Sequence, residues 1–131
     1  MKRIALIGHC GPDSSYLRMA VGRAQRDLQV VMVEDAQELE QVITKGVDLL
    51  LFNRLLDYGF EETEGAAAIG RLRAKHPELK MMLVSNYADA QAEAVAAGAL
   101  PGFGKREIGS ERVTNLIREA IGSEAPVGKN K

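Results

Sequence analysis

The residue types that could do chemistry in this 131-residue sequence lie in four short segments, each directly after an apolar run. These segments are Gly8-His9-Cys10-Gly11-Pro12-Asp13, Asn53-Arg54, Ser85-Asn86-Tyr87 and Gly104-Lys105-Arg106. In an open parallel sheet, ligands bind outside the carboxyl ends of the strands, near the point where the winding of the sheet reverses. If the apolar runs are parallel strands, these segments form the predicted site.

The apolar runs have the length and pattern of buried strands. Residues 4–7, 30–33, 49–52 and 81–84 are continuously apolar, and residues 100–103 form a weaker run. Unbroken runs of this length, in which apolar and polar residues do not alternate, are typical of parallel strands that are covered on both faces. We therefore expect five strands.

Segments with helical spacing follow the runs. Apolar residues recur every three to four positions within residues 17–28, 39–43, 69–72, 88–96 and 113–121. This spacing places one apolar stripe of each helix toward a core. Strands and helices thus alternate along the chain, which predicts an α/β sandwich with right-handed crossovers.

The chain length and the helix signals indicate one domain. Asp13 and Ser14 offer N-cap oxygens to the first helix. The alternating pattern covers residues 1–122, whereas residues 123–131 lack periodicity and are expected to be a tail or the start of a linker. A length of 131 residues fits a single domain with its own core.

Composition excludes several classes of protein. The chain has 17 Lys+Arg against 18 Asp+Glu and a formal net charge of −1, so the basic surplus typical of direct nucleic-acid binding is missing. Its single cysteine excludes a disulfide framework and a Cys-rich zinc fold. The sequence shows no signal peptide and no apolar run near the roughly 18 residues that span a bilayer. We expect a cytoplasmic protein without a membrane partner.

Residues 2–122 resemble a response-regulator receiver domain, the module of two-component signalling. The segment DLLLFN (48–53) is similar to the family's third strand, which ends in a phospho-accepting aspartate. The segment MLVS (82–85) is similar to the fourth strand with its terminal serine or threonine, and GALPGFGK (98–105) to the fifth-strand motif that ends in a lysine. The resemblance implies a flavodoxin-like three-layer sandwich, with a five-stranded parallel sheet in the order 2-1-3-4-5 and five helices.

The sequence departs from the family at the residues that carry out phosphorylation. The family's acidic pair is replaced by Gly8 and His9, the phospho-acceptor by Asn53, the strand-five aromatic by Gly102 and the proline after the lysine by Arg106. Of the expected pocket, Ser85 and Lys105 are kept. The predicted site is thus a degenerate phospho-acceptor pocket.

These replacements remove the chemistry of phosphoryl transfer. An amide cannot form an acyl phosphate, and Mg²⁺ prefers anionic oxygen ligands. The formal charge of the pocket changes from about −3 in the family to about 0 here, because three carboxylates are lost. The prediction is a non-phosphorylatable pseudo-receiver without catalytic residues, bound metal or cofactor, which acts in signal transduction or transcription control by protein contact.

Two acids would compensate if they reached the site. Asp57, four residues past Asn53, would be a displaced phospho-acceptor; otherwise it is a solvated loop acid. Asp13 would supply the missing acid from the start of the first helix; otherwise it is an N-cap.

Cys10 supports a different class of function. It stands after the first strand and before a helix N-terminus, a setting that lowers a thiol pKa and suits cysteine-based phosphoryl transfer. The C-x₅-R motif of cysteine phosphatases would need arginine at position 16, which is Tyr16. Together with His9 and Asp13, Cys10 gives too few good ligands for a tetrahedral zinc site.

The resemblance also implies a contact surface. In the family, the face built from the fourth helix, the fifth strand and the fifth helix meets protein partners or a second copy of the chain. This face maps to roughly residues 88–121, with Gln91, Glu93, Arg112, Asn115, Arg118 and Glu119 expected to be exposed.

Overall fold

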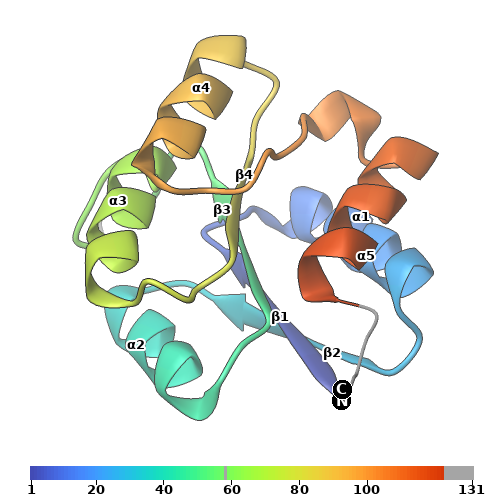
Figure 1. Ribbon diagram of the computed structural model, residues 1–131, viewed down its shortest axis with the longest axis horizontal. Helices are drawn as coiled ribbons and strands as arrows, with labels where there is room; N and C mark the ends of the chain where they lie inside the picture. The colour runs from blue at the N-terminus through green and yellow to red at the C-terminus, as the bar shows by residue number, and fades with distance from the viewer. Residues whose placement is uncertain (58, 123–131) are drawn as a thin grey trace.

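The computed structural model describes residues 1–57 and 59–122 (Figure 1). The strands are β1 (Lys2–Ile7), β2 (Leu28–Val33), β3 (Leu49–Asn53) and β4 (Met81–Val84). The helices are α1 (Gly11–Ala24), α2 (Ala36–Lys45), α3 (Gly65–Lys75), α4 (Ala88–Ala97) and α5 (Glu111–Ile121), with a short 3₁₀ turn, η1 (Lys105–Glu107), before α5. The predicted tail, residues 123–131, lies outside the described residues.

The strands form one parallel sheet in the order β2-β1-β3-β4. Helices α1 and α5 cover one face of this sheet, and α2, α3 and α4 cover the other (Figure 1). Successive residues of a strand point to opposite faces, so Leu50 and Phe52 pack toward α2, α3 and α4, whereas Leu49 and Leu51 pack toward α1 and α5. All four are fully buried. The predicted flavodoxin-like three-layer α/β fold with five helices is confirmed.

The prediction of a fifth strand at residues 100–103 is wrong in detail. This segment lies beside β4, where Leu100 N donates to Met81 O at 2.8 Å, but its ladder is reduced to one isolated parallel bridge between Val84 and Phe103. Its next bond to β4 is from Phe103 N to Leu83 O at 3.4 Å, so the segment advances three residues where β4 advances two, and this extra residue interrupts the ladder. The described sheet thus has four strands, with an irregular segment in the fifth position.

The start of α1 also differs from the prediction. The helix begins at Gly11, with Cys10 in the N-cap position, so Asp13 and Ser14 lie within its first turn and neither is the N-cap. Pro12 allows this early start, because proline is favoured in the first helical turn, where a missing N–H costs nothing. Asp13 is thereby free to bond elsewhere. Within the described residues, none of the helices is long and apolar enough to cross a membrane.

Candidate functional site

Three of the predicted pocket residues line one cavity at the carboxyl ends of the strands. Asn53 ends β3, Ser85 directly follows β4, and Lys105 begins η1. The cavity has a volume of about 290 Å³ and is lined by Asn53, Arg54, Leu55, Val84, Ser85, Asn86, Tyr87 and Lys105. Because parallel β3 and β4 end at the same edge of the sheet, residues far apart in the sequence meet there.

Asn53 turns its amide toward its own loop. Its Nδ2 donates to the backbone oxygen of Leu55 at 2.9 Å. The side chain is half-buried, so the amide lies at the cavity wall and remains within reach of a ligand. The hydroxyl of Ser85, directly after β4, also makes a hydrogen bond within its own loop: Ser85 Oγ accepts from Tyr87 N at 3.1 Å.

Lys105 is paired with the acid predicted as a compensating carboxylate. Its Nζ lies 2.8 Å from Asp13 Oδ2. The hydrogen bond from Lys105 lowers the pKa of Asp13, and smaller contributions come from the Cys10 thiol and from His9. Asp13 therefore reaches the edge of the site, but its negative charge is balanced by the lysine.

His9 is a buried, neutral histidine. Its Nε2 donates to the backbone oxygen of Leu51 at 2.8 Å, while Nδ1 is buried and has no hydrogen-bond partner among the described residues. Burial lowers the pKa of His9 to about 4, and the positive charge of Lys105 acts in the same direction. At neutral pH this position thus carries no charge.

At Gly8, where the family has an acidic residue, apolar side chains occupy the space that a side chain would need. A Cβ built on Gly8 would lie 2.8 Å from Leu56 Cδ2 and 3.6 Å from Phe60 Cε2, and both of these residues are buried. Gly8 has a φ of +72°, a conformation that side chains rarely adopt. The acid of the family has no room here without movement of this apolar cover.

These residues do not fit the divalent metal that receiver phosphorylation uses. Hard cations need several oxygen ligands, mostly carboxylates. Here Asp13, which reaches the edge of the cavity, is bound to Lys105, and no carboxylate is among the residues that line the cavity. Across residues 1–57 and 59–122, no group of three or more His, Cys, Asp or Glu side chains is arranged to hold a metal ion.

Asp57, the predicted displaced phospho-acceptor, is not among the residues that line the cavity. It is exposed in the loop after β3. The loop folds back toward the start of α2, where Ala36 N donates to Gly59 O at 2.9 Å. Cys10 is also exposed, in the N-cap position of α1.

Arg54 and Tyr87 form a side-chain contact that the sequence did not predict. The Arg54 guanidinium lies 4.7 Å from the centre of the Tyr87 ring, a cation–π contact between the loops after β3 and β4, and both residues line the cavity. Both residues stand in the predicted loops, but no spacing rule pairs an arginine with an aromatic residue 33 positions later.

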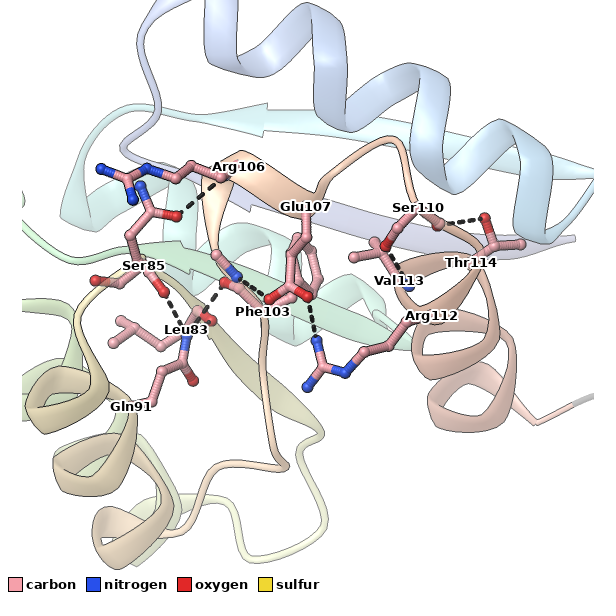
Figure 2. Close-up of polar contacts among 12 residues, drawn as sticks. Leu83, Ser85, Gln91, Phe103, Arg106, Glu107, Ser110, Arg112, Val113 and Thr114 are labelled. Carbon is pink, nitrogen blue, oxygen red and sulfur yellow. Dashed lines mark hydrogen bonds and ion pairs between the residues drawn. The ribbon is translucent and has the colours of Figure 1, made fainter.

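Gln91 was predicted to be exposed, and this prediction is wrong. Figure 2 shows its amide pointing from α4 toward the sheet, where Nε2 lies 2.9 Å from Leu83 O, 3.0 Å from Ser85 O and 3.1 Å from Phe103 O. Leu83 O also accepts from Phe103 N at 3.4 Å, and Phe103 O from Ser85 N at 2.9 Å, so Gln91 is a second donor to these two carbonyls and also donates to Ser85 O. Because buried carbonyls need a donor, the half-buried Gln91 turns inward.

We expect Gln91→Glu to lower the free energy of unfolding by about 1–2 kcal/mol at pH 7, because a carboxylate cannot donate to these carbonyls and is repelled by them. Gln91→Met removes the donor without adding charge and should cost less, about 1 kcal/mol. Urea denaturation of the variants measures both values. If Gln91→Glu were as stable as the parent at pH 7, the hydrogen bonds of the Gln91 amide would contribute nothing to the free energy of unfolding.

The other residues of the predicted contact face do not share one surface. Arg112 is exposed and pairs with Glu107 at 2.7 Å beside the groove between α4 and α5 (Figure 2). Asn115 and Arg118 instead line a hollow next to α1, where Arg118 Nε donates to Ala24 O at 3.4 Å.

The acidic members of the predicted face are likewise dispersed. Glu93 lines a cavity to which Ala66 of α3 also contributes, and Glu119 is exposed on α5. A groove of about 670 Å³ between α4, the fifth segment and α5 is lined by Val95, Phe103 and Arg112, among others. Of the predicted set, only Gln91 and Arg112 line this groove.

The three-layer fold, with its polar loops at the carboxyl ends of a parallel sheet, defines a receiver-like α/β domain. Solved receiver domains are similar to it along nearly their whole length. One is the signal receiver domain of a DNA-binding response regulator (merR) from Colwellia psychrerythraea 34H, with 13% identity and a TM-score of 0.72 over 92% of this chain and 98% of that chain. Another is the apo receiver domain of nitrogen regulatory protein C, with 20% identity and a TM-score of 0.72 over 93% and 95%.

A third similar structure is the beryllofluoride-activated NtrC4 receiver domain dimer, with 16% identity and a TM-score of 0.71 over 94% of this chain and 98% of that chain. No family model and no curated protein matches the sequence. At such identities the likeness shows the fold. The resemblance drawn from the sequence motifs is therefore confirmed at the level of the receiver fold.

Proposed function

We propose that this protein is a pseudo-receiver, a signalling domain that transmits information by protein contact and is not phosphorylated on aspartate. The observation that carries the proposal is the composition of the cavity at the ends of β3 and β4. Asn53 stands at the end of β3, where the motif resemblance places the phospho-acceptor, and an amide cannot form an acyl phosphate.

The surroundings of Asn53 support the same function. Gly8 is covered by Leu56 and Phe60, and His9 is neutral and bonded to a backbone carbonyl. Asp13 is held by Lys105 at 2.8 Å. The carboxylates that would bind Mg²⁺ beside a phospho-acceptor are thus missing or already paired.

We expect the protein to keep its mass when it is incubated with acetyl phosphate and Mg²⁺. Intact-mass spectrometry should show no phosphoryl adduct, and beryllofluoride with Mg²⁺ should leave the amide NMR spectrum unchanged. The NtrC4 receiver domain, which has been solved in a beryllofluoride-activated form, is the positive control. An adduct that disappears in Asp57→Ala would contradict the proposal and make Asp57 a displaced acceptor; one that disappears in Cys10→Ser would assign phosphoryl transfer to the cysteine.

We further propose that residues 1–122 act in the cytoplasm on a protein of a signalling pathway, or on a second copy of the chain. Two observations support a protein partner. The groove between α4 and α5 exposes Val95 next to the charged Arg112, and the similar NtrC4 receiver domain forms a dimer. Light scattering at several concentrations distinguishes a homodimer from a monomer that needs another partner.

A further inference from the structure

The strand β2 forms an open edge of the described sheet, because it pairs with β1 on one side only (Figure 1). Its ladder with β1 runs without a bulge over all six residues, from Leu28 to Val33. Of these six residues only Val33 is buried, whereas β4 is buried throughout. The outer side of β2 is therefore accessible to another strand.

The backbone of β2 has unpaired hydrogen-bonding groups on this outer side. In a parallel ladder the N–H and C=O groups of one residue point to the same side of the strand, and successive residues alternate between the two sides. Val33 O accepts from Gly8 N at 3.0 Å, so the backbone of Val33 faces β1. The backbone groups of Leu28, Val30 and Met32 consequently point away from β1, and no other backbone hydrogen bond in the described part of the chain involves them.

The strand lacks the features that usually protect an open edge. Proteins protect such edges with charged side chains, proline or bulges. The sequence of β2 is LQVVMV, which contains neither a charge nor a proline. Charged residues flank the strand instead: Arg26 precedes it, Glu34 follows it, and both are exposed. An uncharged edge of this kind suits the addition of another strand.

We propose that β2 pairs with the β2 strand of a second copy of the chain, antiparallel and about a two-fold axis at Val30. In this register Leu28 faces Met32 of the second copy, and Val30 faces Val30. Every residue with free backbone groups thus meets another such residue, and each of these pairs exchanges two N–H···O=C bonds. The two four-stranded sheets join into one continuous sheet.

The side chains support this register. Leu28, Val30 and Met32 lie on the α1 and α5 side of the sheet and are half-buried, so pairing covers an apolar row on each copy. The same register brings Arg26 beside Glu34 of the second copy, at both ends of the paired strands. Opposite charges on neighbouring strands stabilise their pairing. A parallel, in-register arrangement would instead bring Arg26 beside Arg26 and Glu34 beside Glu34.

The inference specifies the second-copy contact of the proposed function and rests on that part of it. The resulting assembly is a closed dimer, because the two-fold axis uses the β2 edge of both copies.

Light scattering of the full chain at several concentrations tests the proposal, together with amide hydrogen exchange measured by NMR. We expect a mass twice that of the chain at high concentration. Exchange at Val30 and Met32 should slow about tenfold or more as the concentration rises, because their N–H groups become bonded. Val31 bonds to β1 in either state and should slow less. Equal slowing at the three amides, or a monomer at every concentration, would overturn the inference.

Charge reversal at the strand ends tests the register without touching the core. Arg26→Glu should weaken the dimer about tenfold, because two attractive pairs become repulsive. Adding Glu34→Arg should restore the parent affinity. Arg112→Glu makes the same change of charge in the groove between α4 and α5 and should leave the affinity unchanged.

Circular dichroism checks that each variant is folded. If Arg112→Glu weakens the dimer and Arg26→Glu does not, the copies meet through α4 and α5, and the β2 contact is wrong.

Failure here is distinguishable from failure of the pseudo-receiver function. If the protein is a monomer and acetyl phosphate with Mg²⁺ leaves its mass unchanged, only the β2 contact is wrong. If a covalent adduct forms, the pseudo-receiver function is wrong, whatever the oligomeric state.

Discussion

Replacing Gly102 by alanine is expected to lower the free energy of unfolding by about 3 kcal/mol or more. A Cβ at this position would lie 2.1 Å from the backbone oxygen of Leu83 and 2.9 Å from Gln91 Oε1. The first of these atoms belongs to β4 and cannot move aside as a flexible side chain would. The fifth segment would have to shift away from the sheet and give up its contacts to Leu83 and Gln91.

Urea or thermal unfolding, followed by circular dichroism, measures this loss. Gly22→Ala is the matched control, because a Cβ at Gly22 would meet no atom within 4 Å. Gly22 lies inside α1, so alanine there should stabilise the fold by about 0.5–1 kcal/mol. If Gly102→Ala were as stable as Gly22→Ala, residues 100–103 would not be packed against β4 as the structure shows.

The Gly102 prediction has a functional consequence. Position 102 is where the motif resemblance places the aromatic residue of the receiver switch, and the backbone here leaves no space for any side chain. Phe103, the adjacent aromatic, is buried against α1 and α5. Together with the inward amide of Gln91, this packing holds the fifth segment against β4 and α4.

We also expect the protein to lose about 2–3 kcal/mol of stability between pH 7 and about pH 4.5 through His9. The pKa of His9 is about 4 in the folded protein and 6.5 as its ordinary value, so the unfolded chain binds more protons between these two values. The contribution of neutral His9 is complete above pH 6.5 and is lost progressively as the pH falls toward 4. The physical cause is the cost of placing a positive charge in a buried site near Lys105.

Urea denaturation at several pH values measures this dependence. His9→Gln keeps a donor for the Leu51 carbonyl but has no titrating group, and should flatten the curve between pH 6.5 and 4. His76→Gln, at the only other histidine of the chain, should leave the dependence in place. A parent protein whose stability is constant over this range would show that His9 is not buried as described.

The sequence by itself determined the class of fold and the residue types at the site. Apolar runs near Leu50 and Leu83, separated by amphipathic segments, were sufficient to predict an α/β sandwich, because burial on both faces of a parallel sheet demands them. The loss of carboxylates at Gly8, His9 and Asn53 is likewise a property of the sequence, and so is the predicted loss of phosphorylation chemistry.

Only the tertiary structure decided which groups pair. Lys105 bonds to Asp13, Asn53 turns to the carbonyl of Leu55, and Gln91 turns inward to three carbonyls. Each of these side chains had several chemically equivalent partners, and periodicity reports only which face of an element is apolar. The choice depends on where the backbone places donors and acceptors in space, including the extra residue that interrupts the ladder of the fifth segment.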